Sequence, residues 1–515
     1  MAYAVGSTYE ATLDHSARRQ GAHYTPPEVA EQIAALALDE LPAGTVPTRV
    51  LDPACGGGVF LVAVAELLVR RGVPPTDAVA CLRGVDSDPG AVGAAREAIA
   101  AWADAYGVRS GDAEVRVGDG LSEGLGRADL VIGNPPFQGQ LAADTTRGTE
   151  ATARLRGRFG PEAVAAYVDS ALLFLLAGAE VLNPGGVLAM VQPWSSMSTS
   201  HGAPARDAIL RYAALEAAWV PTGRVFDAEV EVWAPILRKA APSGRLAVHH
   251  GSRVHVVAAV TDGTWAAVAA AVGGVPSVEV GAVRRVADVA DTLSGFRDEY
   301  YAVAANLEEA GDDPGLVGTL AGSMRVVTSG AIDPFTNRWG IDPLRIAKQR
   351  WLHPVVRLGA LDGANERVGR WARRQHRPKV VVANQTRVVE AVADEVGDLL
   401  ALTPSIAAIP RDPSHAEMLA VALSAPCLSA LLHHRRAGSG QSRGALRLSA
   451  ADVADLPIPD DWDALAVAVA ARRGGLSWRE VGRTADAAYG VDEPDVLEWW
   501  LDQLPKRISV SMDSD

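Results

Sequence analysis

Short apolar runs and longer mixed stretches alternate along the first half of the chain. The apolar runs have the length of strands, and the stretches between them have the length of helices. This alternation is typical of a mostly parallel sheet with helices on its faces, so we predict an α/β fold for this half. The predicted strands cover 50–51, 81–85, 113–117, 128–133 and 187–191, and the predicted helices cover 26–41, 59–71, 89–106 and 163–182.

Four of these strands have a polar side chain at or just beyond their carboxyl end, namely Asp52, Asp86, Asp119 and Asn134. Because the carboxyl ends of parallel strands meet at one edge of a sheet, where α/β proteins bind ligands, these four side chains should lie together. Each one alone could be an ordinary strand-end cap. Their recurrence favours a binding site.

A glycine-rich loop, Asp52 to Gly58, joins the first of these strands to a helix. Such a loop lets a ligand approach the backbone closely at a helix N-terminus. The spacing G-x-G-x-x-G is absent, which argues against a nicotinamide cofactor. Asp86, after the second strand, is placed to accept hydrogen bonds from ribose hydroxyls, whereas Asp88 before Pro89 is expected to cap the next helix.

The stretch Asn134-Pro135-Pro136-Phe137 follows the strand at 128–133. Proline cannot continue a hydrogen-bonded ladder, so the strand is expected to end here. An amide, a rigid backbone and an aromatic ring side by side suit the recognition of a planar group that carries nitrogen. Taken alone, the four residues could also form an ordinary turn. Upstream, Thr25 and Glu28 have the spacing of a capping box, with Pro26 at the first helical position.

The composition indicates a globular protein of two or three domains, with 515 residues and 48% hydrophobic content. The longest apolar run, 171–182, contains Glu180 and is too short to span a bilayer, and no basic and apolar leader opens the chain. Three widely spaced cysteines match neither a disulfide framework nor a zinc site. We therefore expect a cytoplasmic protein without a metal.

The net charge of −14 hides two local basic stretches. Residues 341–387 contain eleven Lys or Arg against three Asp or Glu, and residues 433–447 contain four arginines and no acid. A local basic face matters more to a polyanion than the overall charge, so these stretches are candidates for contact with nucleic acid. A solvated charged surface is the alternative.

The ordered motifs resemble those of S-adenosylmethionine-dependent DNA adenine-N6 methyltransferases of the gamma arrangement, as in type II restriction–modification enzymes. The resemblance implies a Rossmann-like class I methyltransferase domain with a seven-stranded, mostly parallel sheet at 1–245. It also implies an α+β target-recognition domain at 246–462. After that domain, the helical spacing of apolar and polar groups predicts a helical segment at 463–515. The segments that carry it are 21–26, 51–61, 84–89, Asp119, 134–137 and 184–186, and more loosely 377–389 and 446–459.

The same resemblance implies roles for the residues of the candidate site. The side-chain oxygen of Asn134 and the carbonyl of Pro135 would accept the two N6 hydrogens of an adenine that is flipped out of the duplex. Phe137 would stack on that base, and Phe226 is the candidate second aromatic, with a core residue as the alternative. For S-adenosylmethionine, Thr25 would contact the methionine carboxylate and Asp52 the amino group. Gly56 and Gly58 would leave room for the cofactor, Asp86 would bind the ribose, and Asp119 the adenine amino group.

Double-stranded DNA is the expected partner of the second half. The residues expected to bind its phosphates are Arg370, Arg373, Arg374, Arg377, Lys379 and Arg443, whereas Trp371 among them is expected to anchor the fold. No Glu-x-Lys nuclease pattern is evident, so a separately encoded restriction nuclease or other defence proteins are the further partners expected. Two alternatives stay open: a methyltransferase for protein glutamine or ribosomal RNA guanine, and a non-catalytic DNA-recognition subunit.

Overall fold

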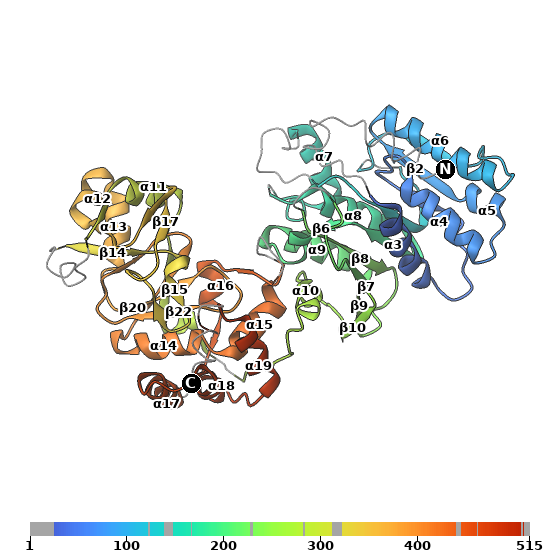
Figure 1. Cartoon of the computed structure of the whole chain (residues 1–515). Coiled ribbons are helices and arrows are strands. Elements are labelled where there is room, and N and C mark those ends of the chain that lie inside the picture. Colours follow the sequence, from blue (N-terminus) through green and yellow to red (C-terminus); the bar gives the residue numbers. More distant parts are fainter. Residues whose placement is uncertain are drawn as a thin grey trace. The chain divides into compact units, whose positions relative to one another are not determined.

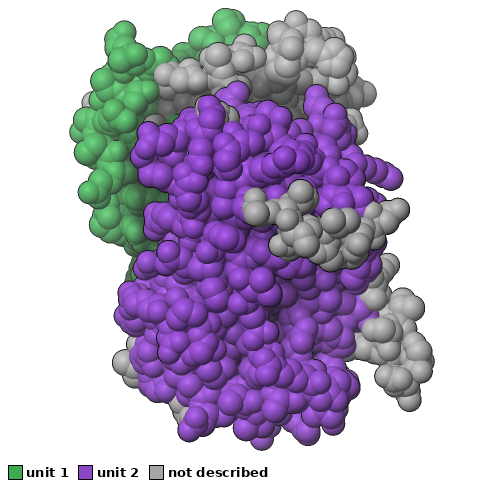
Figure 2. Space-filling view, turned by 90° about the vertical axis from the view of Figure 1, so that its left-hand side faces the viewer, with its two compact units in different colours: residues 1–272 green, residues 273–515 purple. Residues whose placement is uncertain are grey.

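The computed structural model describes residues 25–505 and residue 508, apart from 122–123, 138–147, 166, 227–229, 282–283, 312–321, 439–443 and 461. The chain divides into two compact units, residues 1–272 and residues 273–515 (Figures 1 and 2). The first unit is an α/β domain around one large sheet, and the second combines several small sheets with helices. Each unit is described by itself below.

The sheet of the first unit has ten strands among the described residues, and seven of them follow one another in the order β7-β8-β5-β4-β1-β2-β3. The pairs among β5, β4, β1, β2 and β3 are all parallel, and β8 lies antiparallel between β5 and β7. This is the predicted mostly parallel sheet. Its strands are β1 (Val50–Asp52), β2 (Leu82–Asp86), β3 (Glu114–Val117), β4 (Ala128–Gly133), β5 (Leu182–Met190), β7 (Ala214–Val220) and β8 (Val232–Arg238), and β6 (Gln192–Pro193) pairs with β8.

The central strands are apolar because helices cover both faces of the sheet. Every residue of β1 and β7 is buried, and only one residue of β4 is partly exposed. The helix α8 is almost wholly apolar and is likewise buried along nearly its full length. The helices of this unit are α3 (Pro27–Asp39), α4 (Val59–Arg70), α5 (Pro75–Ala80), α6 (Pro89–Ala105), α7 (Thr149–Phe159), α8 (Ser170–Val181) and α9 (Ala203–Leu210).

Two boundaries differ from those predicted. The helix α8 begins at Ser170, where the Asp169 carboxylate caps it by accepting from the Ala171 N–H at 2.9 Å, and not at residue 163. The first unit ends at residue 272 and not at 245, because the chain adds two more strands to the sheet. These are β9 (Arg245–His250), parallel to β7, and β10 (Arg253–Ala258), antiparallel to β9, and they are followed by α10 (Ala266–Val272).

The second unit contains two four-stranded sheets, β12-β24-β20-β22 and β13-β19-β14-β23. Their strands include β12 (Ala290–Ser294), β13 (Leu307–Glu309), β14 (Ser323–Val327), β19 (Pro354–Arg357), β23 (Leu399–Ala401) and β24 (Ser405–Pro410). The predicted helical segment at the C-terminal end consists of α17, α18 and α19, but it belongs to this unit, because α17 packs on α14 and α19 packs on α15. The elements used below are α11 (Arg297–Ala305), α12 (Leu358–Ala364), α13 (Glu366–Arg374), α14 (Ala416–Leu423), α15 (Pro426–Arg436), α17 (Trp462–Arg473), α18 (Trp478–Ala487), α19 (Pro494–Gln503), β20 (Lys379–Ala383) and β22 (Ala391–Asp394).

Among the described residues, no single helix has the length and apolar character needed to cross a membrane; the bent pair Pro413–Leu423 and Pro426–Arg436 passes that test only when its two parts are taken together. Most of the residues in this pair are buried inside the second unit. All three cysteines are free and buried.

Candidate active site at the carboxyl edge of the sheet

The four predicted polar residues lie at one edge of the sheet. Asp52 and Asp86 are the last residues of β1 and β2, and Asp119 and Asn134 follow β3 and β4. These strands are neighbours in the order β4-β1-β2-β3 and run parallel, so their carboxyl ends coincide. The sheet thus brings together side chains that lie up to about eighty residues apart in the sequence.

The glycine loop is tied to the second strand through Asp86. One carboxylate oxygen of Asp86 accepts from the Gly56 N–H at 2.9 Å, and the other accepts from the Asp88 N–H at 2.9 Å. Gly58 has φ = 83° at the start of α4, and a Cβ there would lie 3.1 Å from the Cβ of Ala95 on α6. A glycine is therefore required both by backbone conformation and by close packing. Asp88 caps α6 as predicted.

Asp52 is the most buried carboxyl group of the site, with 1% of its surface exposed. One oxygen accepts from the Ala54 N–H at 3.0 Å. Burial raises the pKa of Asp52 to about 8, with a smaller contribution from the negative charge of Asp86 and an opposing one from the Ala54 hydrogen bond. Gly133, just before Asn134, packs on this carboxyl group: a Cβ there would lie 2.5 Å from Asp52 Oδ1.

Asn134 is held by a side chain from the start of the described chain. Its Nδ2 donates to Thr25 Oγ1 at 3.0 Å, across a separation of 109 residues. Thr25 is almost fully buried, with 2% of its surface exposed. The predicted capping box is wrong, because Pro26 is the residue that precedes α3 and no side chain caps this helix. The Thr25 hydroxyl is used by Asn134 instead.

The two aromatic candidates differ in exposure. Phe137 is half-buried and packs at the border of the main hydrophobic core of this unit, whereas Phe226 belongs to that core with 6% of its surface exposed. Phe226 therefore offers little surface to a ligand, which agrees with the alternative that it is a core residue. Asp119 is exposed, and its Oδ1 accepts from the Leu121 N–H at 2.9 Å.

An open cavity of about 590 Å³ lies beside this edge, between the start of α3 and the segment that follows β7. Its lining includes Pro26, next to Thr25, and Val225, next to Phe226, but none of the four polar residues at the strand ends. The glycine loop and those residues therefore define the candidate site by their own geometry, and the cavity adjoins it.

These features fit a ligand that carries hydroxyl groups and a positive charge. The Asp86 carboxylate can accept further hydrogen bonds, the buried Asp52 carboxyl group lies beside it, and the glycines leave the backbone uncovered. Among the described residues, no group of three or more His, Cys, Asp or Glu side chains could hold a metal ion.

The basic residues predicted to bind phosphates differ in whether they are buried, paired with a carboxylate or exposed. Lys379 is fully buried and forms an ion pair with Asp394, so its prediction is wrong: β20 is a buried strand and its first side chain points into the unit. Arg370 pairs with Glu366 at 2.5 Å.

Another of the predicted arginines, Arg373, also has a partner, which is Asp362. Arg374 and Arg377 are exposed, and Arg443 lies outside the described residues. Trp371 is buried with 7% exposed, in agreement with an anchoring role.

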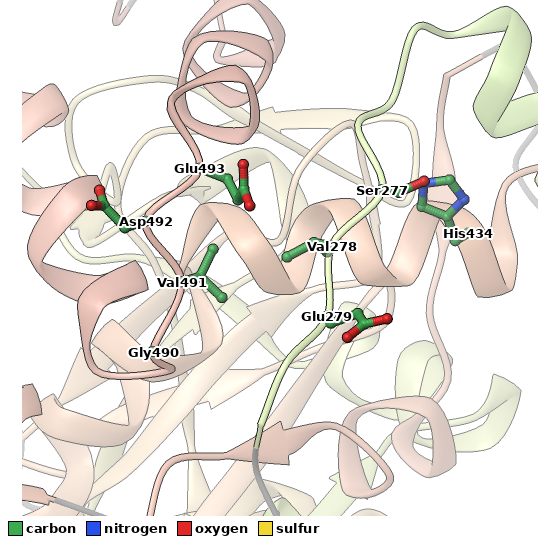
Figure 3. A pocket seen from close by; sticks show the side chains of 8 residues that line it. All are labelled: Ser277, Val278, Glu279, His434, Gly490, Val491, Asp492 and Glu493. Carbon is green, nitrogen blue, oxygen red and sulfur yellow. The ribbon is translucent and has the colours of Figure 1, made fainter.

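A second cavity, of about 490 Å³, lies in the second unit (Figure 3). Segment 277–279, His434 of α15 and segment 490–493 line it, and three carboxylates, Glu279, Asp492 and Glu493, are among the side chains drawn there. This concentration of negative charge opposes binding of a phosphate backbone, so the cavity is not a candidate for contact with DNA.

Residues 2–242 match the model of the N-6 DNA Methylase family, a range that covers nearly all of the first unit and all of the site described above. The amino-terminal unit belongs to the N-6 DNA methylase family. S-adenosylmethionine is the cofactor that this family implies, and the carboxyl groups and glycines at the sheet edge fit it.

Two curated relatives match parts of the N-6 DNA methylase unit. The type II methyltransferase M.BanIII of Aneurinibacillus aneurinilyticus is 28% identical over 195 residues, covering 34% of this chain and 30% of the relative. The ribosomal RNA large subunit methyltransferase G of Streptomyces griseus subsp. griseus is 39% identical over 118 residues, covering 23% of this chain and 26% of the relative. The chain thus spans less than a third of the length of either relative.

Solved structures resemble both units of the chain. The type IIL restriction–modification enzyme MmeI, in complex with DNA, matches 99% of this chain and 82% of its own with a TM-score of 0.59 and 12% identity. The DrdV–DNA complex matches 93% of this chain and 60% of its own with a TM-score of 0.50 and 12% identity. At 12% identity these matches show a likeness of fold alone. The likeness of fold includes the second unit.

Asp52→Asn should change how stability depends on pH. The folded protein keeps the Asp52 proton up to about pH 8, whereas the unfolded chain releases it near the ordinary pKa of 3.8, so the wild type loses stability as pH rises between these values. The variant lacks this loss. We expect it to gain a few kcal/mol on the wild type between about pH 5 and about pH 8, since one pKa unit corresponds to about 1.4 kcal/mol.

Urea unfolding of the cofactor-free proteins at the two pH values measures this gain. Asp112→Asn, at an exposed position away from the site, is the control and should follow the wild type at both pH values. A stability difference between Asp52→Asn and the wild type that does not change with pH would contradict the burial argument.

Proposed function

We propose that this protein is a site-specific DNA methyltransferase that transfers a methyl group from S-adenosylmethionine to N6 of adenine in double-stranded DNA. The observation that carries the proposal is the Asn134 amide, fixed by Thr25 beside the Asp52 and Asp86 carboxyl groups, in a unit of the N-6 DNA methylase family. The expected context is restriction–modification or phage defence, with a separately encoded nuclease or other defence proteins as partners.

The target adenine must leave the base stack to reach this edge of the sheet. In the proposal, its N6 hydrogens are accepted by the Asn134 side-chain oxygen and by the Pro135 carbonyl, which follows β4 directly. These bonds favour a pyramidal nitrogen whose lone pair is available for attack. Phe137, which is half-buried, stacks on the base, since Phe226 has little free surface. The bound cofactor supplies an electrophilic methyl group, and the protein contributes positioning and charge stabilisation.

Thr25 has two roles in the proposed mechanism. Its oxygen accepts the hydrogen bond from Asn134 Nδ2 at 3.0 Å, which fixes the orientation of the amide. Its own hydrogen remains a donor, because a hydroxyl can donate and accept at once, and this hydrogen is suited to the methionine carboxylate of the cofactor. One hydroxyl would thus link cofactor and substrate base.

The other residues that we propose to contact the cofactor lie at the ends of successive strands. Asp52, on β1, faces the amino group of the cofactor, and Asp86, on β2, binds the ribose hydroxyls. Asp119, after β3, is exposed and accepts from the cofactor adenine. Gly56 and Gly58 allow the close approach.

Methylation of ribosomal RNA guanine is the second candidate, because the relative with 39% identity over 118 residues is named a ribosomal RNA methyltransferase. That match covers 23% of the chain. The DNA proposal also accounts for a second unit of more than 200 residues, whose fold extends the likeness to MmeI over 99% of the chain.

Incubation of the pure protein with methyl-labelled S-adenosylmethionine and mixed-sequence duplex DNA should label N6 of adenine. Ribosomal RNA and total protein from the same cells are offered in parallel. Nucleoside analysis by mass spectrometry identifies the product. Label in guanine of ribosomal RNA or in protein glutamine, with none in DNA adenine, would refute the proposal, whereas duplex binding without any labelling would favour a non-catalytic recognition subunit.

Asn134→Ala should lower the rate of methyl transfer by at least about a hundredfold, because it removes an acceptor that acts on the reacting nitrogen. Cofactor affinity, measured by calorimetry without DNA, should stay within a few fold of the wild type. Loss of cofactor binding in this variant, with the fold intact by circular dichroism, would contradict the role given to Asn134.

Thr25→Val should weaken cofactor binding and should also slow methyl transfer by about ten- to a hundredfold at saturating cofactor, since the amide of Asn134 is no longer oriented. Thr25→Ser keeps the hydroxyl and should restore most of the rate. Single-turnover kinetics separates binding from transfer. A Thr25→Val variant with weak binding but the wild-type rate at saturation would leave Thr25 with the cofactor role alone.

A further inference from the structure

A basic β-hairpin in the second unit has features that the proposed chemistry does not explain. Its strands, β17 (Leu344–Ile346) and β18 (Gln349–Trp351), pair antiparallel and are joined by the two residues Ala347 and Lys348. Leu344 and Ile346 are buried, so Arg345, which lies between them on the strand, points outward. The exposed residues include three cations, Arg345, Lys348 and Arg350.

The hairpin has two unfavourable features. Arg345 and Arg350 are direct partners across the two strands, and like charges in this arrangement repel. Ala347 and Lys348 have φ of 50° and 68°, in the left-handed region that two-residue hairpin turns require and that Asn-Gly satisfies with less strain. Locally unfavourable structure of this kind often marks a functional element.

The three hairpin cations have no carboxylate partner within 4.0 Å in the part of the chain that the structure describes. Arginines on the neighbouring segments differ in this respect. Arg357 pairs with Glu308 at 2.8 Å, and Arg367 pairs with Asp298 at 2.9 Å. On helix α13, Arg367, Arg370 and Arg373 are thus paired with carboxylates and only the last residue, Arg374, is not, whereas all three cations of the hairpin keep their free charge among the described residues.

Exposed aromatic side chains lie on α11 and at the residue just before it, and α11 contacts the hairpin. The Ala347 N–H donates to the Tyr300 hydroxyl at 2.9 Å. The next residue, Tyr301, is 58% exposed, and Phe296 is 71% exposed. The Arg297 guanidinium lies 5.7 Å from the centre of the Tyr301 ring.

The acids of α11 are engaged elsewhere. Asp298 forms the ion pair with Arg367, and the carboxylate of Glu299 is buried and accepts from the Phe296 N–H at 3.0 Å. The surface formed by the hairpin and the start of α11 therefore combines free positive charge with aromatic rings. This composition is typical of a surface that binds nucleic acid.

We propose that the β17–β18 hairpin binds the phosphate backbone of duplex DNA through Arg345, Lys348 and Arg350. This inference rests on the proposed function, which makes DNA the substrate. A phosphate between Arg345 and Arg350 would replace their repulsion by two attractions, so DNA binding would relieve an unfavourable contact of the free protein. A two-stranded ribbon also has the width that the major groove admits.

The test compares two triple variants that each remove three positive charges from the second unit. One is R345Q/K348Q/R350Q. The other is R357Q/R367Q/R479Q, in which each exposed arginine has a carboxylate partner, namely Glu308, Asp298 and Glu498. Binding of fluorescent duplex DNA to the full chain is measured against salt concentration, and cofactor affinity and thermal melting report on the fold.

The hairpin variant should bind duplex DNA at least about tenfold more weakly near physiological salt. The slope of log K against log salt should become shallower by about 2 to 3, because each phosphate contact contributes about 0.9. The control variant should change the slope by less than about 1. Equal changes in the two variants, or an unchanged slope in the hairpin variant, would overturn the inference.

The variant Lys348→Gly tests separately whether Lys348 strains the backbone of the turn and whether its side chain contacts DNA. Glycine adopts the left-handed turn freely, so this variant should melt at a higher temperature than the wild type while binding DNA more weakly. A variant that melts higher and binds DNA as the wild type does would show that Lys348 makes no contact. If the wild-type protein binds no duplex DNA at all, the proposed function itself fails, and this result is distinct from equal binding by the two triple variants.

Discussion

The buried carboxyl group of Asp52 constrains the whole carboxyl edge of the sheet. It ends the central strand β1, between β4 on one side and β2 on the other. The chain must pass it closely at the end of β4, and only the absence of a side chain at Gly133 permits this, since a Cβ would lie 2.5 Å from Asp52 Oδ1. Asn134 follows directly, so its position is set by that passage. On the other side, Asp86 holds the glycine loop through the Gly56 N–H. The geometry of the site is thus built outward from one desolvated acid.

The bond between Asn134 and Thr25 joins two segments with different predicted partners. Thr25 precedes α3 and is predicted to bind the cofactor, whereas Asn134 follows β4 and is predicted to bind the substrate base. A hydroxyl can accept one hydrogen bond and donate another, so in the proposed mechanism cofactor binding at Thr25 would help to order the Asn134 amide. In that proposal a single buried side chain would link the binding of the two reactants.

Whether a segment of the second unit carries free positive charge depends on the ion pairs of its basic residues, and not on how many basic residues it contains. The α13 arginines lie within the densest basic stretch, yet Arg370 and Arg373 have carboxylate partners, and Lys379 is buried against Asp394. The hairpin contributes fewer cations but leaves them unpaired among the described residues and opposite one another. For a partner that binds through counterion release, the unpaired cations matter most. The acid-lined cavity elsewhere in this unit has the opposite character.

The sequence alone determined the four strands of the site and the polar residues at their ends. Apolar runs between glycine and proline fixed the strands β1 to β4 to within a residue or two, and the polar residues at their ends followed from that. The sequence could not reveal the Thr25–Asn134 bond, because its partners are 109 residues apart and a serine or threonine before a proline has the pattern of a cap. It also placed the end of the first unit too early, at 245, since the edge strands β9 and β10 join the sheet only through long-range pairing. Tertiary contacts also decided that Lys379 is buried and that Arg370 and Arg373 are paired with carboxylates. The sequence shows that a residue is charged, but not whether its partner is a carboxylate, a phosphate or water.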